Sequence, residues 1–183
     1  MTSKSIKRAE LAQRTAERLL AAGVAQIPLR DLAAELGTSD RMLLYYFKDK
    51  AELVVESLGV VAAGLAQTLE SAAPPVRSAP GDLLLSVLAR LGAESLTPVM
   101  NVWADVAARG GRGEEPFRTI ARQTVARWLD WIEQRLDIED ASERRAAAAA
   151  ILTVVEGARQ LEASAPGSTT HVGAILSRAF GGR

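Results

Sequence analysis

The sequence predicts an all-helical protein with an N-terminal three-helix domain, residues 1–50, and a larger helical domain, residues 51–183. Apolar residues recur at three- and four-residue spacing along successive segments, which is the period of an amphipathic helix. Segments rich in proline and glycine separate these stretches, and none shows the alternation of apolar and polar residues typical of a strand. At 183 residues the chain can bury a sizeable core in one or two domains.

The first predicted helix follows a short basic arm and spans roughly residues 6–22. Its buried stripe combines small and apolar residues at helical spacing: Leu11, Ala12, Thr15, Ala16 and Leu19. Arg14 and Arg18 point away from this stripe. We expect the helix to brace the pair that follows.

Residues 29–50 contain two very short predicted helices around a tight turn. The first has an apolar stripe: Leu29, Leu32, Ala33 and Leu36. Pro28 suits its first position, where a missing N–H costs nothing. Gly37 can take the left-handed conformation that stops this helix, and Ser39 is a good N-cap for the next.

The second short helix has an unusual composition. Asp40 and Arg41 lie outward at its start, and Leu43 and Leu44 are expected to pack inward. A helix that enters the major groove by its N-terminus carries its polar residues first, so the segment is interpreted as a helix-turn-helix. Phe47 is expected in the core of this small domain.

A long helix is predicted over residues 49–72, because Asp49 and Glu52 have the spacing of a capping box. The segment 74–81, with three prolines and a glycine, is the strongest loop signal in the chain. The long helix is therefore the expected bridge between the two domains.

Five further helices are predicted in the second domain. Residues 83–91 are apolar on nearly all sides, so this helix should be deeply buried. Thr97 and Pro98 open a helix that runs to Arg109 before a glycine-rich break. Pro116 opens the next, whose apolar face comprises Phe117, Ala121, Thr124, Val125, Trp128, Trp131 and Ile132.

Asp140 and Glu143 form a second capping-box pair. The helix they start has two faces, which suggests two packing partners; one holds Ile151, Val154, Val155 and Ala158, and the other Thr153, Gly157 and Leu161. After a break at residues 166–168, a last helix aligns Val172, Ile175, Leu176 and Ala179.

Composition narrows the class of protein. The N-terminus lacks the apolar core of a secretory signal, no apolar run is long enough for a membrane span, and there is no cysteine, so a soluble, cytoplasmic protein is expected. Net charge is zero, but residues 1–50 hold nine basic and six acidic side chains, a modest sign of a basic face.

The sequence lacks the combinations of residues from which catalytic sites are usually built. The single histidine, His171, has no cysteine, metal-ligand spacing or phosphate-binding loop to act with, so we expect no enzyme, cofactor or metal. His171 is interpreted as a surface or interface residue near a helix start. Acidic pairs at helix starts need no role beyond complementing the helix dipole.

The run from Gly37 to Lys50 resembles the signature of the TetR (tetracycline repressor) family, in which Gly-Val-Ser precedes Leu-Tyr-Tyr-His-Phe and a lysine. Gly23 and the segment Leu29-Arg30-Asp31-Leu32-Ala33 are also in register, and the detailed match covers roughly residues 6–55. The sequence departs from the pattern at Leu44, Tyr46 and Ile27-Pro28, which replace a tyrosine, a histidine and a Thr-Ser pair.

The resemblance implies a DNA contact set: Arg30, Thr38, Ser39, Asp40, Arg41, Met42, Tyr45, Tyr46, Lys48 and Lys50. Arg41 is the best candidate for reading guanine by a bidentate bond, and Lys48 and Lys50 suit phosphates. The alternative for Tyr45 and Tyr46 is that they are core aromatics rather than phosphate contacts.

The resemblance also implies an effector cavity among the middle helices and a dimer interface formed by the last two. The predicted effector contacts are Met100, Trp103, Phe117, Thr124, Trp128 and Trp131. The alternative is that these residues belong to the hydrophobic core, because aromatic residues at helical spacing usually pack inside a protein. The predicted dimer contacts are Gly157, Leu161, Val172, Ile175, Leu176 and Ala179.

These expectations describe a TetR-like regulator, interpreted as a repressor. It would bind palindromic operator DNA as a homodimer and be released by a small hydrophobic effector, with no membrane partner. The alternative is a helical ligand-binding or protein-interaction module that has lost DNA binding, which the departures at Leu44 and Ile27-Pro28 favour.

Overall fold

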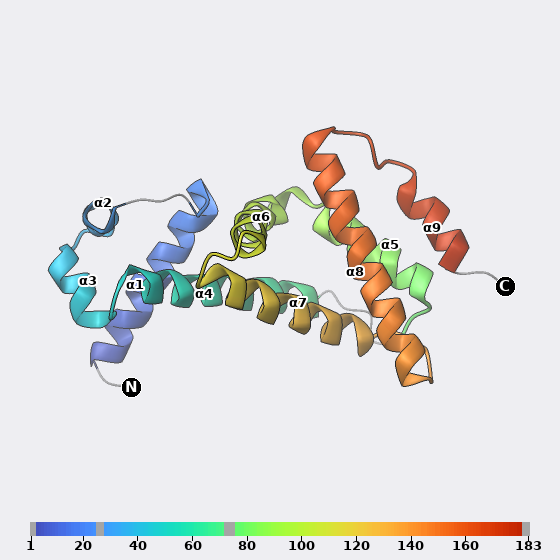
Figure 1. Cartoon of the computed structure of the whole chain (residues 1–183), viewed down its shortest axis with the longest axis horizontal. Coiled ribbons are helices and arrows are strands. Elements are labelled where there is room, and N and C mark those ends of the chain that lie inside the picture. Colours follow the sequence, from blue (N-terminus) through green and yellow to red (C-terminus); the bar gives the residue numbers. More distant parts are fainter. Residues whose placement is uncertain (1–2, 25–27, 72–75, 181–183) are drawn as a thin grey trace. The chain divides into compact units, whose positions relative to one another are not determined.

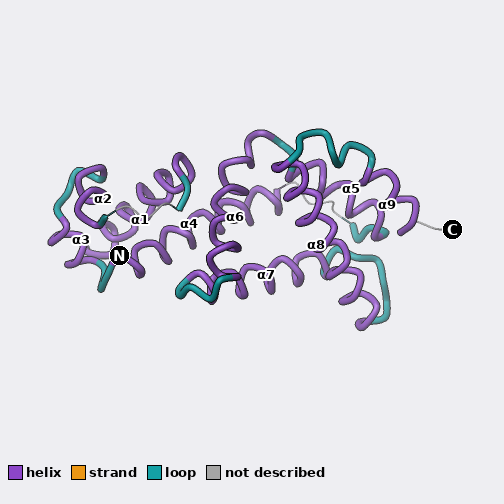
Figure 2. Tube along the Cα trace, turned by 45° about the horizontal axis from the view of Figure 1, so that its top comes forward, coloured by secondary structure: helices purple, strands orange, loops and turns teal. Residues whose placement is uncertain are grey.

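The structure of the chain, a computed structural model, describes residues 3–24, 28–71 and 76–180 (Figure 1). Within these ranges the chain forms helices joined by short loops and no strand longer than a single bridge (Figure 2). The predicted all-α fold is confirmed. Ile27, Pro74 and Pro75, which carried parts of the sequence argument, lie outside the described residues.

Contacts divide the chain into two compact units. The first contains residues 1–72 and 98–121, and the second contains residues 73–97 and 122–183. This grouping follows packing, so the functional division predicted at residue 50 stays a prediction.

The first unit is built on α1 (Ser3–Ala22), which packs along α4 (Lys50–Ser71), with α2 (Leu29–Glu35) and α3 (Asp40–Tyr46) between them in the chain. Its core joins residues from all four helices: Leu11, Ala12, Leu32, Ala33, Leu36, Leu43, Phe47 and Leu53. The predicted stripe of α1 is buried as expected, and so is Phe47, with 1% of its surface exposed.

This unit also includes α6 (Thr97–Gly111) and the first residues of α7 (Phe117–Glu133). The two helices approach closely at Gly110, where an added Cβ would lie 3.0 Å from the Ala121 Cβ and 3.1 Å from the Phe117 carbonyl oxygen. A side chain at this position would push the helices apart, so glycine fixes the crossing.

The second unit contains the rest of α7, together with α5 (Pro80–Leu91), a short 3-10 helix (Glu94–Leu96), α8 (Ala141–Ser164) and α9 (Val172–Phe180). Helix α5 packs on both α8 and α9. The core of this unit comprises Leu83, Leu84, Val87, Ile132, Leu136, Ala148, Ile151 and Val155. Leu85 is 39% exposed, so α5 is buried on fewer sides than its sequence predicts.

Two local features refine the predicted elements. Asp140 caps α8 by accepting a hydrogen bond from the Glu143 amide at 2.7 Å, as the capping-box spacing predicts. Ser78 forms an isolated parallel bridge with Leu136: its amide donates to the Arg135 carbonyl, and its carbonyl accepts from the Asp137 amide, both at 2.9 Å. This pairing could not be predicted from the sequence, because a single bridge has no alternating pattern of apolar and polar residues.

Helix α4 is long and apolar enough to cross a membrane by length and composition alone. Its apolar residues, however, include a buried row that faces the protein: Leu53, Leu58, Val61, Leu65 and Leu69. The core helix of a soluble protein meets the same test of length and composition.

Candidate nucleic-acid interface

The turn between α2 and α3 has the geometry expected of a helix-turn-helix. Gly37 has φ +67°, a left-handed conformation that glycine adopts at low cost. The Ser39 Oγ accepts a hydrogen bond from the Met42 amide at 3.2 Å and so caps α3. Both roles predicted from the sequence are confirmed.

The inner side of α3 is fixed by Leu43 and by Phe47, the residue that ends the helix. Both are 1% exposed and belong to the core shared with α1 and α4. The prediction that Leu44 also packs inward is wrong, because its side chain is 50% exposed. Successive residues of a helix differ by about 100° in direction, and on α3 this turns Leu44 away from the core that buries Leu43.

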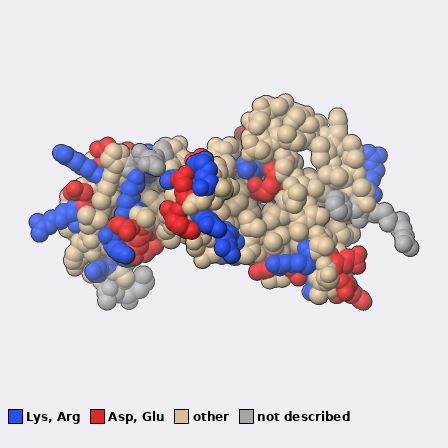
Figure 3. Space-filling view, viewed as in Figure 1, with Lys and Arg blue, Asp and Glu red and all other residues tan. Residues whose placement is uncertain are grey.

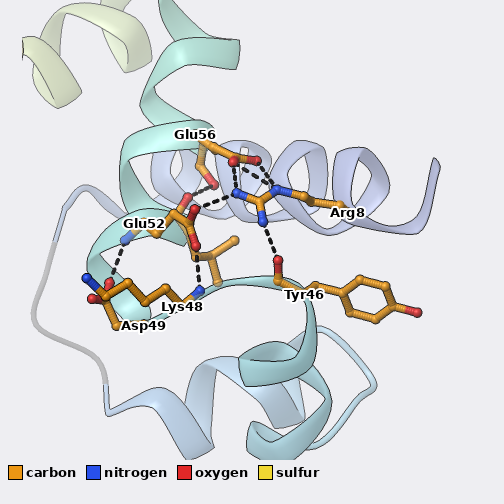
Figure 4. Close-up of polar contacts among 8 residues, drawn as sticks. Arg8, Tyr46, Lys48, Asp49, Glu52 and Glu56 are labelled. Carbon is orange, nitrogen blue, oxygen red and sulfur yellow. Dashed lines mark hydrogen bonds and ion pairs between the residues drawn. The ribbon is translucent and has the colours of Figure 1, made fainter. Parts of the chain in front are cut away.

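A cluster of salt bridges and hydrogen bonds joins the end of α3 to the start of α4 (Figure 4). We call it the Arg8 clamp, and its members are Arg8, Tyr46, Lys48, Asp49, Glu52 and Glu56. The Arg8 guanidinium donates to the Glu52 carboxylate at 2.8 Å, to the Glu56 carboxylate at 2.9 Å, and to the Tyr46 backbone carbonyl. That carbonyl belongs to the last residue of α3, so Arg8 ties α3 to α4.

The same cluster caps α4. The Asp49 carboxylate accepts from the Glu52 amide at 2.8 Å, and the Glu52 carboxylate accepts from the Lys48 amide. The first bond is the one that the capping-box spacing predicts, whereas the second comes from the amide one residue before the capping residue Asp49. The hydrogen bond from Arg8, followed by that from the Lys48 amide, lowers the pKa of Glu52, so the carboxylate stays ionised at neutral pH.

The outer side of α3 is exposed and chemically mixed: Asp40, Arg41, Met42, Leu44 and Tyr45. The Tyr45 ring is 59% exposed and stands edge-on to the Tyr46 ring, with centroids 5.0 Å apart. The Lys4 Nζ lies 4.5 Å from the centroid of the Tyr45 ring. The beginning of α1 therefore adds a cation beside the outer side of α3.

Basic residues of this region fall into two groups. Arg8, Arg14 and Arg18 donate to acceptors inside the first unit and so hold its helices together. A second group is exposed and forms no salt bridge within the part of the chain that the structure describes: Lys4, Arg30, Arg41 and Lys48. Basic side chains project from the surface near α2 and α3, at the left in Figure 3.

The remaining predicted DNA contacts are less accessible. Thr38, Tyr46 and Lys50 are half-buried, and Tyr46 packs against the core. Burial, and then the charges of Arg109 and Arg18, lower the pKa of Lys50. The DNA roles of these residues stay predictions, with Lys48 and Tyr45 better placed than Lys50 and Tyr46 for a phosphate.

Helix α6 holds the loop between α1 and α2, a connection that the sequence did not reveal. The Asp105 carboxylate accepts from the Val24 amide at 2.9 Å, and the Arg109 guanidinium donates to the Val24 carbonyl at 3.5 Å. Gly23, with φ +75°, makes room for this contact, since an added Cβ would lie 2.9 Å from the Asp105 Oδ2. No spacing rule links residues that lie 81 positions apart in the chain.

The predicted effector residues are distributed over both units. In the first unit Met100, Trp103 and Phe117 are buried, and the Arg109 guanidinium lies 3.7 Å from the Phe117 ring centroid. In the second unit the half-buried members are Thr124, Trp128 and Trp131. All six stay predicted contacts.

A separate pocket in the second unit is polar and open, and it is lined by Arg77, Asp130, Glu133, Gln134, Arg144 and Arg145. The Arg145 guanidinium already binds the Asp130 carboxylate at 2.9 Å and the Glu133 carboxylate at 2.7 Å. This pocket does not have the apolar lining predicted for an effector. Among the described residues no cluster of acidic and histidine side chains could hold a metal ion.

The predicted dimer residues lie on the outer sides of α8 and α9. Leu161 and Ile175 are each 57% exposed, and Gly157 and Ala179 are exposed as well. Val172 and Leu176 are half-buried, and Leu176 packs against the core of the second unit. Their part in a dimer stays a prediction.

Comparisons with known proteins agree with this geometry. Residues 14–57 match the family model described as bacterial regulatory proteins, tetR family. The structure resembles the crystal structure of a Rhodococcus sp. protein described as a candidate TetR-family transcriptional regulator, with a TM-score of 0.68 and 21% sequence identity over 96% of each chain. No curated protein matches the chain. The family model confirms the resemblance seen in residues 37–50, and the crystal structure confirms the fold.

Proposed function

We propose that this chain is a transcriptional regulator of the TetR type with a DNA-binding helix-turn-helix, and that it is a repressor that binds a palindromic operator as a homodimer and is released by a small hydrophobic effector. The match of residues 14–57 to the family model supports the DNA-binding part of this proposal.

The observation that carries the proposal is a group of exposed cations around α3 that form no salt bridge among the described residues: Lys4, Arg30, Arg41 and Lys48. Exposed cations outside the salt bridges of the described residues can neutralise phosphates without first breaking one of those ion pairs. Phosphate contacts of this kind position a protein on DNA, while the side chains at the start of the recognition helix reach base edges.

The experiment is a titration of a fluorescent duplex from the DNA that flanks the gene, followed by anisotropy at several salt concentrations. If all four cations of both protomers each neutralise one phosphate, log K should fall against log salt with a slope of about −7. Arg122→Ala, at an exposed arginine of α7, is the matched control and should leave the slope unchanged. Binding that ignores salt, or no binding to any duplex, would refute the DNA-binding proposal.

The proposed dimer rests on the exposed apolar residues of α8 and α9. Leu161 and Ile175 expose most of their surface, and the upper right of Figure 3, over α8 and α9, is mostly free of charged side chains. A two-fold interface buries the same patch on both subunits. A dimer also presents two recognition helices, so half-sites should lie about 34–36 Å apart or at a related spacing.

The proposed effector response is supported within the first unit by the contacts of α6. The Arg109 guanidinium lies over the Phe117 ring and donates to the Val24 carbonyl at 3.5 Å, so a ligand that displaced Phe117 would disturb a bond to the α1–α2 loop. A ligand shifts a conformational equilibrium only through its different affinities for the two states. Its effect on operator affinity must therefore be reciprocal.

The amphipathic dye 1-anilinonaphthalene-8-sulfonate is a suitable first probe of this response. A saturating dye concentration should weaken operator binding, and operator should weaken dye binding by the same factor, with a coupling of about 1–3 kcal/mol. Phe117→Leu should reduce the coupling but retain operator binding, because α3 is untouched. A dye that binds near tryptophan and leaves operator affinity unchanged would argue against release by an effector at this place.

A further inference from the structure

Leu44 exposes an apolar side chain in the middle of the recognition helix. It is 50% exposed on α3, whereas the preceding Leu43 is fully buried. Residues three apart are neighbours on a helix surface, so Leu44 lies beside Arg41, which is also exposed. An apolar side chain therefore stands next to the best candidate for a guanine contact.

The surroundings of Leu44 indicate which partner would cover it. Arg41 and Lys48 are exposed cations without a salt bridge among the described residues, and both charges favour a polyanion over an apolar protein surface. The position also lies within residues 14–57, the segment that matches the family model. In the major groove, the apolar group that base edges present is the C5-methyl of thymine.

We propose that Leu44 is a specificity-determining residue that recognises the methyl group of one thymine in each operator half-site. The inference rests on the proposed function, because it requires that α3 enters the major groove. It also gives a physical role to a departure from the family pattern that otherwise favours loss of DNA binding. An exposed leucine is a cost in the free protein, and the methyl contact removes that surface from water.

The test begins with selection of a preferred operator from a random duplex library. Each thymine of the selected site is then replaced by deoxyuridine, which removes the methyl group and keeps every hydrogen-bonding atom. Burial of one methylene-sized group is worth about 0.8 kcal/mol, and 1.4 kcal/mol is a tenfold change in affinity, so one thymine per half-site should show about a fourfold loss.

Three variants locate the effect. Leu44→Ala should bind the thymine and deoxyuridine operators equally at that position, and it should fold because the side chain it shortens is half exposed. Arg41→Ala should bind more weakly but retain the fourfold methyl preference. Val76→Ala, which alters a 72% exposed residue in the second unit, should behave as the wild type.

Two results would overturn the inference while leaving DNA binding in place. One is a wild type that binds thymine and deoxyuridine equally at every position, and the other is a methyl preference that survives in Leu44→Ala. A library from which no duplex is selected would instead refute the proposed function, and this inference with it.

Discussion

The helix-turn-helix and the α8–α9 pair leave opposite kinds of side chain without a partner. The helix-turn-helix buries its apolar residues in a closed core, apart from Met42, Leu44 and Tyr45, and leaves exposed Arg30, Arg41 and Lys48 outside any salt bridge of the described residues. On α8 and α9 the basic side chains are all bonded within the chain: Arg144, Arg145, Arg159 and Arg178. There the large exposed hydrophobic side chains are Leu161 and Ile175.

The difference shows how one chain can present two different interfaces. Unpaired cations attract a polyanion at long range, and their interaction weakens with salt. Exposed apolar side chains attract nothing at long range and favour only a surface that excludes water. The two regions should therefore respond in opposite ways to added charge and to ionic strength.

The largest effect is expected from a charge placed among the exposed apolar residues of α8 and α9. Ile175→Asp should convert the dimer to monomers, because two carboxylates would face each other across an isologous contact without partners. An uncompensated buried charge costs roughly 3–5 kcal/mol. Sedimentation equilibrium measures the outcome.

Val76→Asp provides the control for this change, because it adds the same charge at a 72% exposed residue of the same unit. It should leave the dimer intact, and circular dichroism should show the same helix content in both variants. An unchanged dimer in Ile175→Asp would move the interface away from α9.

The sequence could predict those features of the fold and the candidate site that depend on residues close together in the chain. Gly37, Ser39, Asp49 and Glu52 act through bonds to residues within a few positions, so their spacing alone predicted the turn and both caps. The Arg8 clamp and the Asp105 contact join residues 48 and 81 positions apart, and no local pattern encodes them. Leu44 was misplaced because a seven-residue helix is too short for two adjacent leucines to define its buried side.

The exposed cations can be separated by the kind of contact each should make. Arg41→Ala should relax base preference at one position per half-site and cost about 1–3 kcal/mol there, because a bidentate contact to guanine is lost. Binding to mutant operators, one base pair at a time, measures this. An equal loss for every sequence would assign Arg41 to the phosphates instead.

Acid should weaken the helix-turn-helix through Glu52. Its pKa is lowered in the folded state, so its contribution to stability is complete above the ordinary value of 4.5 and is lost as pH falls through the folded value. Glu52→Gln keeps an acceptor for the Lys48 amide but removes the charge that faces Arg8. The difference in melting temperature between wild type and variant should be largest at pH 7 and should shrink towards pH 3.

Glu17→Gln is the matched control, since Glu17 is exposed on α1 and accepts only from the neutral Gln13 amide at 3.1 Å. It should melt like the wild type throughout the same range of pH. A Glu52→Gln variant whose deficit is the same at pH 7 and pH 3 would show that the carboxylate contributes through its shape and not through its charge.

The smallest expected effect separates phosphate contacts from base contacts most sharply. Lys48 is exposed just beyond α3, and its backbone amide, not its ammonium group, donates the hydrogen bond to the Glu52 carboxylate. Lys48→Ala should therefore leave the fold intact, weaken binding to all sequences alike, and reduce the magnitude of the salt slope by about 1 per protomer. Anisotropy at several salt concentrations, on the preferred operator and on a scrambled duplex, measures both quantities. A loss confined to the preferred operator would mean that Lys48 contacts a base. Lys48 would then belong with the base-contacting residues of α3 and not with the phosphate contacts.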